Sequence, residues 1–227
     1  MSHKNKLSGY FSSFFQEVIL DVYQSQINPD LEVAIINGRY QLNTGKVNYS
    51  FGPLHDAFRK YFSKDVPKLY DDSKVLILGF GAGSVAYILR NELGFNSHIT
   101  GIEVDETVIE IARKHFYLDK LKNIETHVSD AYDYVESCSG KFDLIVIDIY
   151  IDDKVPVKFE SRVFIERIYH CLKDSGKVVF NRLRPANCGD QSIKVLTGKF
   201  DSIFPKVKTV VIPINKASPN YFIVGER

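Results

Sequence analysis

The sequence predicts an α/β fold: a doubly wound, seven-stranded sheet with an antiparallel last strand, preceded by a small N-terminal β-hairpin region. Two observations carry this prediction. From Lys74 onward, short apolar runs alternate with helical segments, which is the pattern of parallel strands covered on both faces. The last two apolar runs follow one another without a helix between them, so we expect them to pair antiparallel.

The first part of the chain is predicted to form the hairpin layer. Strands are expected at 18–23 and 31–36, with a turn at Asn28-Pro29-Asp30 between them. Asn37-Gly38 marks a tight turn into a third strand at 39–42. An exposed layer of this kind can pair across the two-fold axis of a homodimer.

The rest of the chain is predicted to alternate between strands and helices. Asp105 is the expected N-cap of the second core helix. The expected strands are 75–78, 98–103, 124–128, 142–148, 177–181, 207–212 and 221–224. The expected helices are 53–62, 84–93, 107–116, 131–135, 159–172 and 190–204. Five strand–helix units closed by a β-hairpin make up the seven-stranded sheet.

The length and composition fit this architecture. A chain of 227 residues is enough for one α/β domain at 63–227 and a hairpin region with its linking helix at 1–62. Hydrophobic residues make up 44% and charged residues 25%, as in an ordinary globular protein. The formal net charge is +1 without a block of like charge, so we expect neither nucleic acid nor a membrane surface as partner, but a small molecule.

Targeting and cysteine patterns predict a cytoplasmic protein. The first ten residues have no apolar core typical of a signal peptide, and the longest uncharged run, 75–89, is too short to span a bilayer. Cys138, Cys171 and Cys188 are widely spaced and odd in number, so we expect a reducing compartment, no disulfide framework and no metal site.

The glycine-rich segment Leu78-Gly-Phe-Gly-Ala-Gly-Ser84 lies between the first core strand and its helix. A backbone without Cβ atoms at this edge lets a ligand approach closely, so Gly79, Phe80, Gly81, Ala82 and Gly83 are candidate ligand contacts. The third glycine of the dinucleotide fingerprint would fall at Ser84, which disfavours a nicotinamide-dependent oxidoreductase. The alternative is a turn without a function.

Three carboxylates lie at or just after the ends of the following strands. Glu103 can accept hydrogen bonds from both ribose hydroxyls of a nucleoside, or it can serve only the dipole of the next helix. Asp130 can accept from an adenine amino group, cap the short helix, or do both. Asp148 can act as a base or orient a nucleophile, or it can cap a loop. Val104 and Ala131 adjoin the first two and are also candidate ligand contacts.

These motifs together resemble the ordered series of the spermidine synthases and their relatives of the methyltransferase fold, over roughly residues 31–182. The resemblance implies a methyltransferase-type (Rossmann-like) domain that binds S-adenosylmethionine or its decarboxylated form. By this likeness Gln41 contacts the nucleoside, Glu103 the ribose and Asp130 the adenine. Asp148 takes the position of the catalytic aspartate.

The departures from that family concern its charged positions. Ala82 stands where the aminopropyltransferases carry an aspartate that meets the amine of the decarboxylated donor. Ile151 stands at the second acceptor-binding aspartate, and 49–53 replaces an acidic segment. A dicationic acceptor needs several carboxylates to offset its desolvation, so these changes favour ordinary S-adenosylmethionine.

Three hypotheses follow. The first is an S-adenosylmethionine-dependent methyltransferase with a small acceptor, in which Tyr49 and Tyr150 are candidate wall residues of the acceptor site. The second is an aminopropyltransferase that makes spermidine or a related polyamine. The third is a nucleoside-binding protein that kept the fold and lost the reaction.

Overall fold

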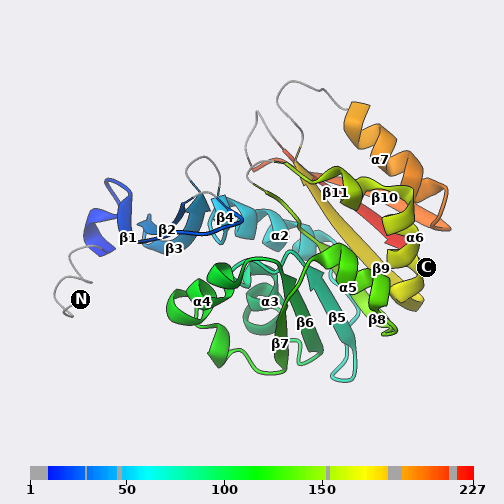
Figure 1. The fold of residues 1–227 in the computed structure, drawn as a ribbon, viewed down its shortest axis with the longest axis horizontal. Helices are drawn as coiled ribbons and strands as arrows, with labels where there is room; N and C mark the ends of the chain where they lie inside the picture. Colours follow the sequence, from blue (N-terminus) through cyan, green and yellow to red (C-terminus); the bar gives the residue numbers. More distant parts are fainter. Residues whose placement is uncertain (1–9, 29, 45–47, 152–153, 184–190, 215–218) are drawn as a thin grey trace.

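The computed structural model describes residues 10–28, 30–44, 48–151, 154–183, 191–214 and 219–227. Its N-terminal part is a four-stranded antiparallel sheet in the order β1-β2-β3-β4 (Figure 1). The strands are β1 (Val18–Tyr23), β2 (Leu31–Ile36), β3 (Arg39–Thr44) and β4 (Asn48–Ser50). The predicted hairpin region is therefore one strand larger than expected, because the three residues of β4 are too few to produce a recognisable pattern. Pro29 of the predicted turn lies outside the described residues.

The main sheet has seven strands in the order β10-β11-β9-β8-β5-β6-β7. The five strands from β7 to β9 run parallel, and β11 is antiparallel to both of its neighbours. This confirms the predicted doubly wound sheet with its antiparallel last strand. The bounds are β5 (Lys74–Leu78), β6 (His98–Glu103), β7 (Ile124–Val128), β8 (Phe142–Ile147), β9 (Leu172–Leu183), β10 (Lys206–Ile212) and β11 (Asn220–Glu226).

The helices cover both faces of this sheet (Figure 1). They are α2 (Pro53–Lys64), α3 (Ser84–Tyr87), α4 (Glu106–His115), α5 (Ala131–Ser137), α6 (Arg162–Cys171) and α7 (Gln191–Asp201). Shorter turns are the π-helical η1 (Ile88–Glu92) and the 3-10 helices η2 (Leu118–Lys120) and η3 (Val157–Glu160). The predicted start of the last helix, Asp190, lies outside the described residues.

Among the predicted elements that differ in extent, two have a clear local reason. The helix expected from Phe159 begins only at Arg162, because the Ser161 hydroxyl caps it by accepting a hydrogen bond from the Phe164 N–H at 3.2 Å. The strand expected at 177–181 begins already at Leu172, because a register shift in its pairing with β8 absorbs the predicted turn.

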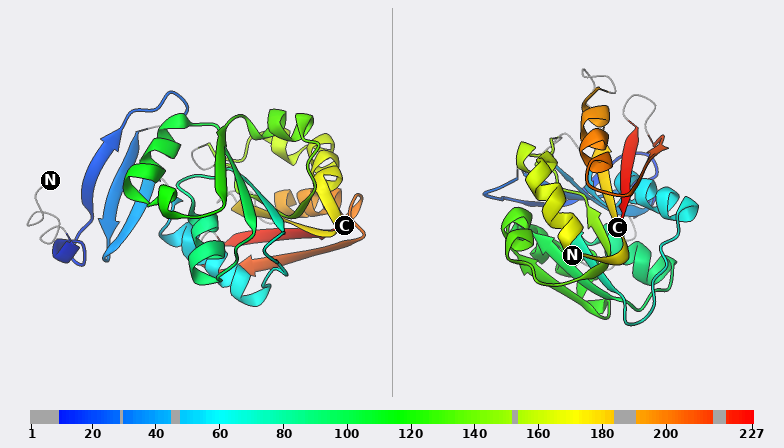
Figure 2. Two further views of the ribbon diagram at one scale, coloured as in Figure 1. Left: turned by 90° about the horizontal axis from the view of Figure 1, so that it is seen from below. Right: turned by 90° about the vertical axis from the view of Figure 1, so that its right-hand side faces the viewer.

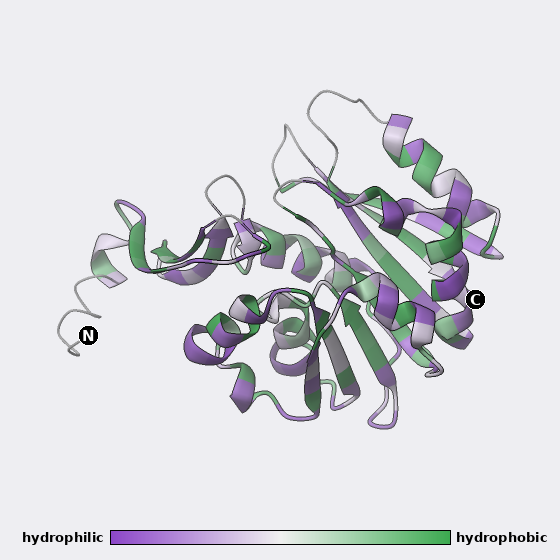
Figure 3. Ribbon diagram, in the orientation of Figure 1, coloured by the Kyte–Doolittle hydropathy of each residue, from purple (hydrophilic) through white to green (hydrophobic). Residues whose placement is uncertain are grey.

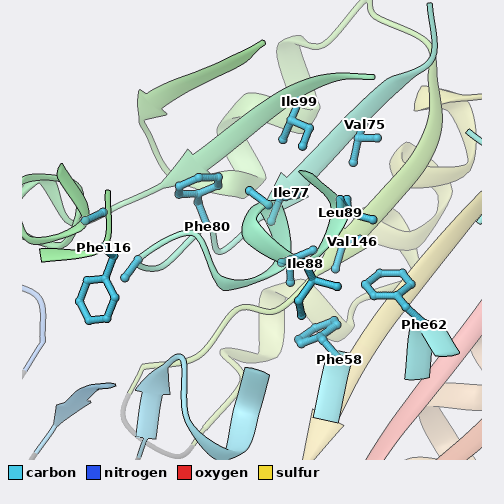
Figure 4. Packing of buried hydrophobic residues seen from close by; sticks show 14 of the residues in the cluster. Phe58, Phe62, Val75, Ile77, Phe80, Ile88, Leu89, Ile99, Phe116 and Val146 are labelled. Carbon is cyan, nitrogen blue, oxygen red and sulfur yellow. The ribbon is translucent and has the colours of Figure 1, made fainter. Parts of the chain in front are cut away.

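Alternation along the strands divides the core into two halves. Val75 and Ile77 of β5 belong to the cluster beneath α2, α3 and α4, whereas Leu76 and Leu78 belong to the cluster beneath α5, α6 and α7. Figure 4 shows the first cluster, and Figure 3 shows apolar strands between helices whose outer faces are polar. A strand that buries both faces explains why its sequence is a continuous apolar run.

Backbone hydrogen bonds join the ends of four adjacent strands. The Asp148 N–H donates to the carbonyl of Leu78 at 2.8 Å, which joins β8 to β5. The Phe80 N–H donates to the carbonyl of Ile102 at 2.9 Å, and the Ser129 N–H to that of Glu103 at 2.9 Å. The residues that follow β5, β6, β7 and β8 therefore lie along one edge of the sheet.

The N-terminal sheet stands at one end of the molecule beside α4, opposite β10 and β11 (Figure 2). It shares an apolar core cluster with the main domain and adds polar contacts at the carboxyl edge of the main sheet. The Ala82 N–H donates to the Ser50 hydroxyl at 3.2 Å, and the Asn28 amide donates to Asp105 at 2.7 Å. The linking helix α2 packs Tyr61 on Phe222 with ring centroids 4.7 Å apart.

Candidate functional site

A cavity of about 300 Å³ opens where these strands end. Its walls come from the ends of β5, β6, β7 and β8, from the segment around η3, and from β4 of the N-terminal sheet. The structure brings together ten of the predicted site residues in this wall: Tyr49, Gly79, Phe80, Gly81, Glu103, Val104, Asp130, Ala131, Asp148 and Tyr150.

The glycine-rich segment is shaped by positive φ angles, 78° at Gly79 and 57° at Gly81. A Cβ atom at Gly79 would lie 2.2 Å from the backbone carbonyl oxygen of Asp148, so only glycine fits there. At Gly81 the nearest atom to such a Cβ would be the Ser50 hydroxyl oxygen at 3.4 Å. Gly81 lines the cavity, with Ser50 and Tyr49 of β4 in van der Waals range of that Cβ position.

Phe80 contributes to the wall from within the core. Its side chain is 3% exposed, and a Cβ atom at Gly101 would lie 2.2 Å from its ring. Figure 4 shows the Phe80 ring over β6, beside Ile99. The aromatic ring therefore holds the glycine segment on the sheet, and it does so because Gly101 leaves room for it.

Glu103 is turned toward the glycine segment. One carboxylate oxygen accepts a hydrogen bond from the Gly81 N–H at 2.8 Å, and the other accepts from the N–H groups of Val104 at 3.0 Å and Asp105 at 3.2 Å. Burial raises the pKa of Glu103 although these bonds favour its ionised form. A carboxyl group is therefore held in the cavity wall between the glycine segment and the start of α4.

Tyr49 of β4 reaches the same carboxylate from the N-terminal sheet. Its hydroxyl donates to Glu103 at 3.5 Å, and a Cβ atom at Gly81 would lie 3.9 Å from its ring. Burial first, and then the charge of Glu103, raises the pKa of Tyr49 well above its ordinary value. The hydroxyl is therefore a hydrogen-bond donor rather than a base.

Asp130 performs the capping role that the sequence left open. Its carboxylate accepts from the Tyr132 N–H at 2.8 Å and begins α5. The ammonium of Lys158 on η3 lies 2.5 Å from its other oxygen and also lines the cavity. Sequence reasoning missed Lys158, because a single lysine in a loop has no pattern around it. Val104 and Ala131 add apolar surface to the wall.

Asp148 lies one residue beyond β8. One carboxylate oxygen accepts a hydrogen bond from the side-chain amide of Asn181 at 2.9 Å. Burial outweighs this bond and, together with the charge of Glu103, raises the pKa of Asp148 to about 7. A carboxylate with such a pKa can accept a proton at neutral pH, which suits a general base.

Tyr150 contributes its ring to the wall while its hydroxyl is engaged in two bonds. The hydroxyl accepts from the Leu183 N–H at 2.7 Å and donates to the backbone carbonyl of Asn181 at 3.2 Å. Burial, and then the charge of Asp148, raises the pKa of Tyr150 above its ordinary value. The residue thus joins the segment after β8 to the end of β9.

Three predicted contacts are not among the residues that line the cavity. The Gln41 side chain packs against Gly52, where a Cβ atom would lie 2.5 Å from its amide. The methyl group of Ala82 is 2% exposed and packs in the core beneath α2, α3 and α4. Gly83, with φ at 90°, turns the chain into α3 and faces the Phe80 ring.

Two general features are absent from the described residues. They contain no group of three or more metal-ligating side chains. Among the helices that the structure describes, none has the length and apolar character needed to cross a membrane.

Comparison with known families matches the part of the chain that forms the main sheet and most of the cavity wall. A family model described as a methyltransferase domain matches residues 69–207. The chain is 29% identical over 143 residues to the polyamine aminopropyltransferase of Vibrio vulnificus, covering 62% of this chain and 46% of that protein. It is 26% identical over 136 residues to the eEF1A lysine and N-terminal methyltransferase of Mus musculus, covering 55% and 19%. The chain thus spans less than half the length of these curated relatives.

Solved structures share the fold. A probable spermidine synthase from Corynebacterium glutamicum superposes with a TM-score of 0.68 at 19% identity, covering 92% of this chain and 79% of that one. Human methyltransferase-like protein 13 in complex with SAH superposes with a TM-score of 0.56 at 19% identity, covering 75% and 77%. The first likeness includes the N-terminal sheet as well as the main domain, since it extends over nearly the whole chain.

Proposed function

This chain belongs to the methyltransferase domain family, and on that premise we propose that it transfers a methyl group from S-adenosylmethionine to a small acceptor bound beside Asp148. The cavity at the carboxyl edge of the sheet is the proposed site. Its fit to the donor rests on the glycine backbone at Gly81 in the cavity wall and on the carboxylate of Glu103 held beside it. The donor supplies a methyl group on a sulfonium, which is activated for direct displacement.

Each part of the donor has a partner in the proposal. Glu103 binds the ribose hydroxyls, and Gly79 and Gly81 pass beneath the sulfonium end. Asp130 accepts from the adenine amino group, and Val104 and Ala131 contact the purine ring. Gln41, Ala82 and Gly83 would support this arrangement from behind the wall, since the cavity lining does not include them.

The chemical work of the protein is to align the acceptor and remove its proton. Displacement at a sulfonium needs an acceptor nucleophile in line with the breaking bond, so alignment and the exclusion of water supply much of the rate. Asp148 accepts the proton that the nucleophile loses, and the rings of Tyr49 and Tyr150 wall the acceptor site. Neither tyrosine serves as a base, because both hydroxyl pKa values are raised.

One observation carries the choice of methyl transfer. The described part of the cavity wall contains three carboxylates, Glu103, Asp130 and Asp148. When the nucleoside binds to Glu103 and Asp130, Asp148 is the single carboxylate of this wall left to offset all the cationic groups of the reactants. The tail of S-adenosylmethionine carries its own carboxylate, whereas the decarboxylated donor and a polyamine acceptor bring uncompensated ammonium groups.

A second candidate is aminopropyl transfer to a polyamine. It is favoured by the similarity to the aminopropyltransferases and by the position of Asp148 at the end of β8. In the structure, the position of their donor-binding aspartate is taken by the buried methyl group of Ala82. We therefore rank aminopropyl transfer second.

Titration calorimetry with the two donors separates these candidates. We expect S-adenosylmethionine to bind at least about tenfold more tightly than its decarboxylated form, a difference of about 1.4 kcal/mol. A tenfold preference for the decarboxylated form would reverse the ranking. Turnover with ordinary S-adenosylmethionine and a panel of small amines and hydroxyl compounds then identifies the acceptor.

Substitution at Ala82 tests the charge argument directly. The Ala82 methyl group packs in the core, so burial of a charge there drives the longer side chain of Ala82→Asp out toward the cavity. The carboxylate then attracts the free ammonium and repels a donor carboxylate, which is expected to shift the ratio of the two affinities toward the decarboxylated donor. Ala82→Asn is the matched control, since it has a similar size and no charge. If both variants shift the ratio equally, size rather than charge is responsible.

We also propose a cytoplasmic homodimer in which β1 pairs with its copy. β1 is the edge strand of the N-terminal sheet, and Ile19 and Val22 are 50% and 54% exposed. Light scattering is expected to give twice the mass of the chain, and Ile19→Lys with Val22→Lys to give the monomer. Val211→Lys on the distant edge strand β10 is the control, and a monomeric unmodified chain would refute the pairing.

A further inference from the structure

Two buried asparagines connect the proposed base to the interior of the sheet. Asn181 on β9 is 0% exposed and Asn220 on β11 is 4% exposed. The Asn220 amide donates to the side-chain oxygen of Asn181 at 2.9 Å, and the Asn181 amide donates to Asp148 at 2.9 Å. The three side chains thus form a chain of hydrogen bonds across β11, β9 and the end of β8. Sequence reasoning assigned neither asparagine a role.

The order of these bonds fixes the orientation of each group. An asparagine side chain has a donating and an accepting end, and a carboxylate only accepts. Because Asn220 donates to the oxygen of Asn181, the amino end of Asn181 must face Asp148. A reversed Asn181 would place two oxygens against each other and leave the Asn220 amide without this acceptor, in a buried place where unpaired polar groups are costly.

A second contact holds the same end of β9. The Tyr150 hydroxyl bridges the Leu183 N–H and the carbonyl of Asn181. The segment after β8 and the strand that carries Asn181 are therefore joined at two points. This joint holds Asn181 beside Asp148.

We propose that Asn181 and Asn220 are positioning residues that hold one oxygen of Asp148 and leave its other oxygen for the acceptor. The assignment rests on the proposed function, because it takes Asp148 as the group that receives the acceptor's proton. It adds a restriction on the acceptor: the nucleophile must itself donate an N–H or O–H to a single carboxylate oxygen. An amine or an alcohol meets that requirement.

The charged and titratable groups around Asp148 set the direction of the test. Glu103 on β6 raises the pKa of Asp148, while the hydrogen bond from Asn181 lowers it. Tyr49 of β4 and Tyr150 also face it, and both remain protonated because their pKa values are raised. Removal of the Asn181 amide therefore raises the pKa of Asp148, and removal of the Asn220 amide does the same to a smaller extent by freeing Asn181 to turn.

The experiment measures this pKa by carboxyl carbon NMR on the full chain without donor, for Asn181→Leu and Asn220→Leu. We expect an upward shift in both, larger for Asn181→Leu. In turnover, the acidic limb of the kcat profile should move to higher pH by the same amount, a loss of about tenfold for each unit when measured below the pKa. The affinity for the donor should stay unchanged. Ile223→Val is the control, because Ile223 is equally buried on β11 and takes no part in the hydrogen-bond chain.

The two readouts distinguish the inference from the function on which it rests. An unchanged pKa in both folded variants overturns the positioning role, whatever the turnover. A shifted pKa combined with an unmoved kcat profile supports the hydrogen-bond chain and contradicts Asp148 as the base. Thermal unfolding establishes that the variants are folded, and Asn220→Leu keeps the test available if Asn181→Leu does not fold.

Discussion

Replacing Asp148 by asparagine is expected to lower kcat by about 100- to 10,000-fold, the usual contribution of a positioned general base. Asparagine has nearly the same shape and can still accept the hydrogen bond from Asn181, so the cavity keeps its form. It cannot take a proton from the acceptor. Donor affinity should change little, which calorimetry on the same variant measures. If turnover is unaffected, the acceptor does not use this carboxylate, and if the unmodified chain binds the donor without turnover, the chain is a nucleoside-binding protein.

The pH dependence of the unmodified enzyme follows from the same group. The pKa of Asp148 is raised to about 7, and only the ionised form can act as the base. Below pH 7 we expect kcat to rise about tenfold per pH unit, and above it to level off. The Asp148→Asn variant should lack this limb. A rate that is already at its plateau at pH 5 would place the responsible group elsewhere.

The raised pKa also has a consequence for stability, and its sign can be worked out. The ordinary pKa of an aspartate, 3.8, lies below the folded value, so between these two values the folded chain binds more protons than the unfolded chain. Stability contributed by this site therefore falls as the pH rises from about 4 to about 7. At pH 8 the folded chain must hold a buried, ionised carboxylate that asparagine removes, so Asp148→Asn should raise the unfolding temperature more at pH 8 than at pH 5. The substitution thus stabilises the fold while it lowers the rate.

The arrangement of the main sheet could be predicted because its evidence is local. Most core strands are short apolar runs, and a glycine or polar residue marks the end of each: Gly79 follows β5, Glu103 ends β6 and Ser129 follows β7. Parallel connections through helices place all of these ends on one edge. The N-terminal sheet was predicted less completely, since β4 is only three residues long. The π-helical turn η1 has no sequence signal that separates it from a continued α-helix.

The sequence predicts those site residues that lie at the ends of strands, but not the side chains that contact them. Glu103, Asp130 and Asp148 each follow or end a recognisable strand, so their shared edge follows from the topology. The partners of these carboxylates depend on contacts between strands far apart in the sequence. Lys158 reaches Asp130, and Asn181 reaches Asp148, through side-chain geometry that no local pattern encodes. Residues that orient a site therefore need the folded structure to be found.

The largest effect on stability is expected from Gly79→Ala. A Cβ atom there would lie 2.2 Å from the carbonyl oxygen of Asp148, 2.7 Å from its carbonyl carbon and 3.1 Å from the Cα of Ile149, all of them backbone atoms that cannot rotate away. The φ angle of 78° adds the strain of a left-handed conformation, about 1–2 kcal/mol. A forced shift of packed backbone adds about 1–3 kcal/mol. We expect a total loss of about 2–5 kcal/mol in the free energy of unfolding.

Substitutions at two other glycines separate the conformational strain from the steric overlap. Gly94 has a similar φ of 73° but nothing within 4 Å of its Cβ position, so Gly94→Ala should show the conformational strain alone. Gly198 lies within the helix α7, also with nothing within 4 Å, and Gly198→Ala should be neutral or stabilising by up to about 1 kcal/mol. Denaturant unfolding of the three variants measures the differences. If Gly79→Ala costs no more than Gly94→Ala, then β5 and β8 do not approach each other closely at Asp148, and the cavity built on that approach has a different shape.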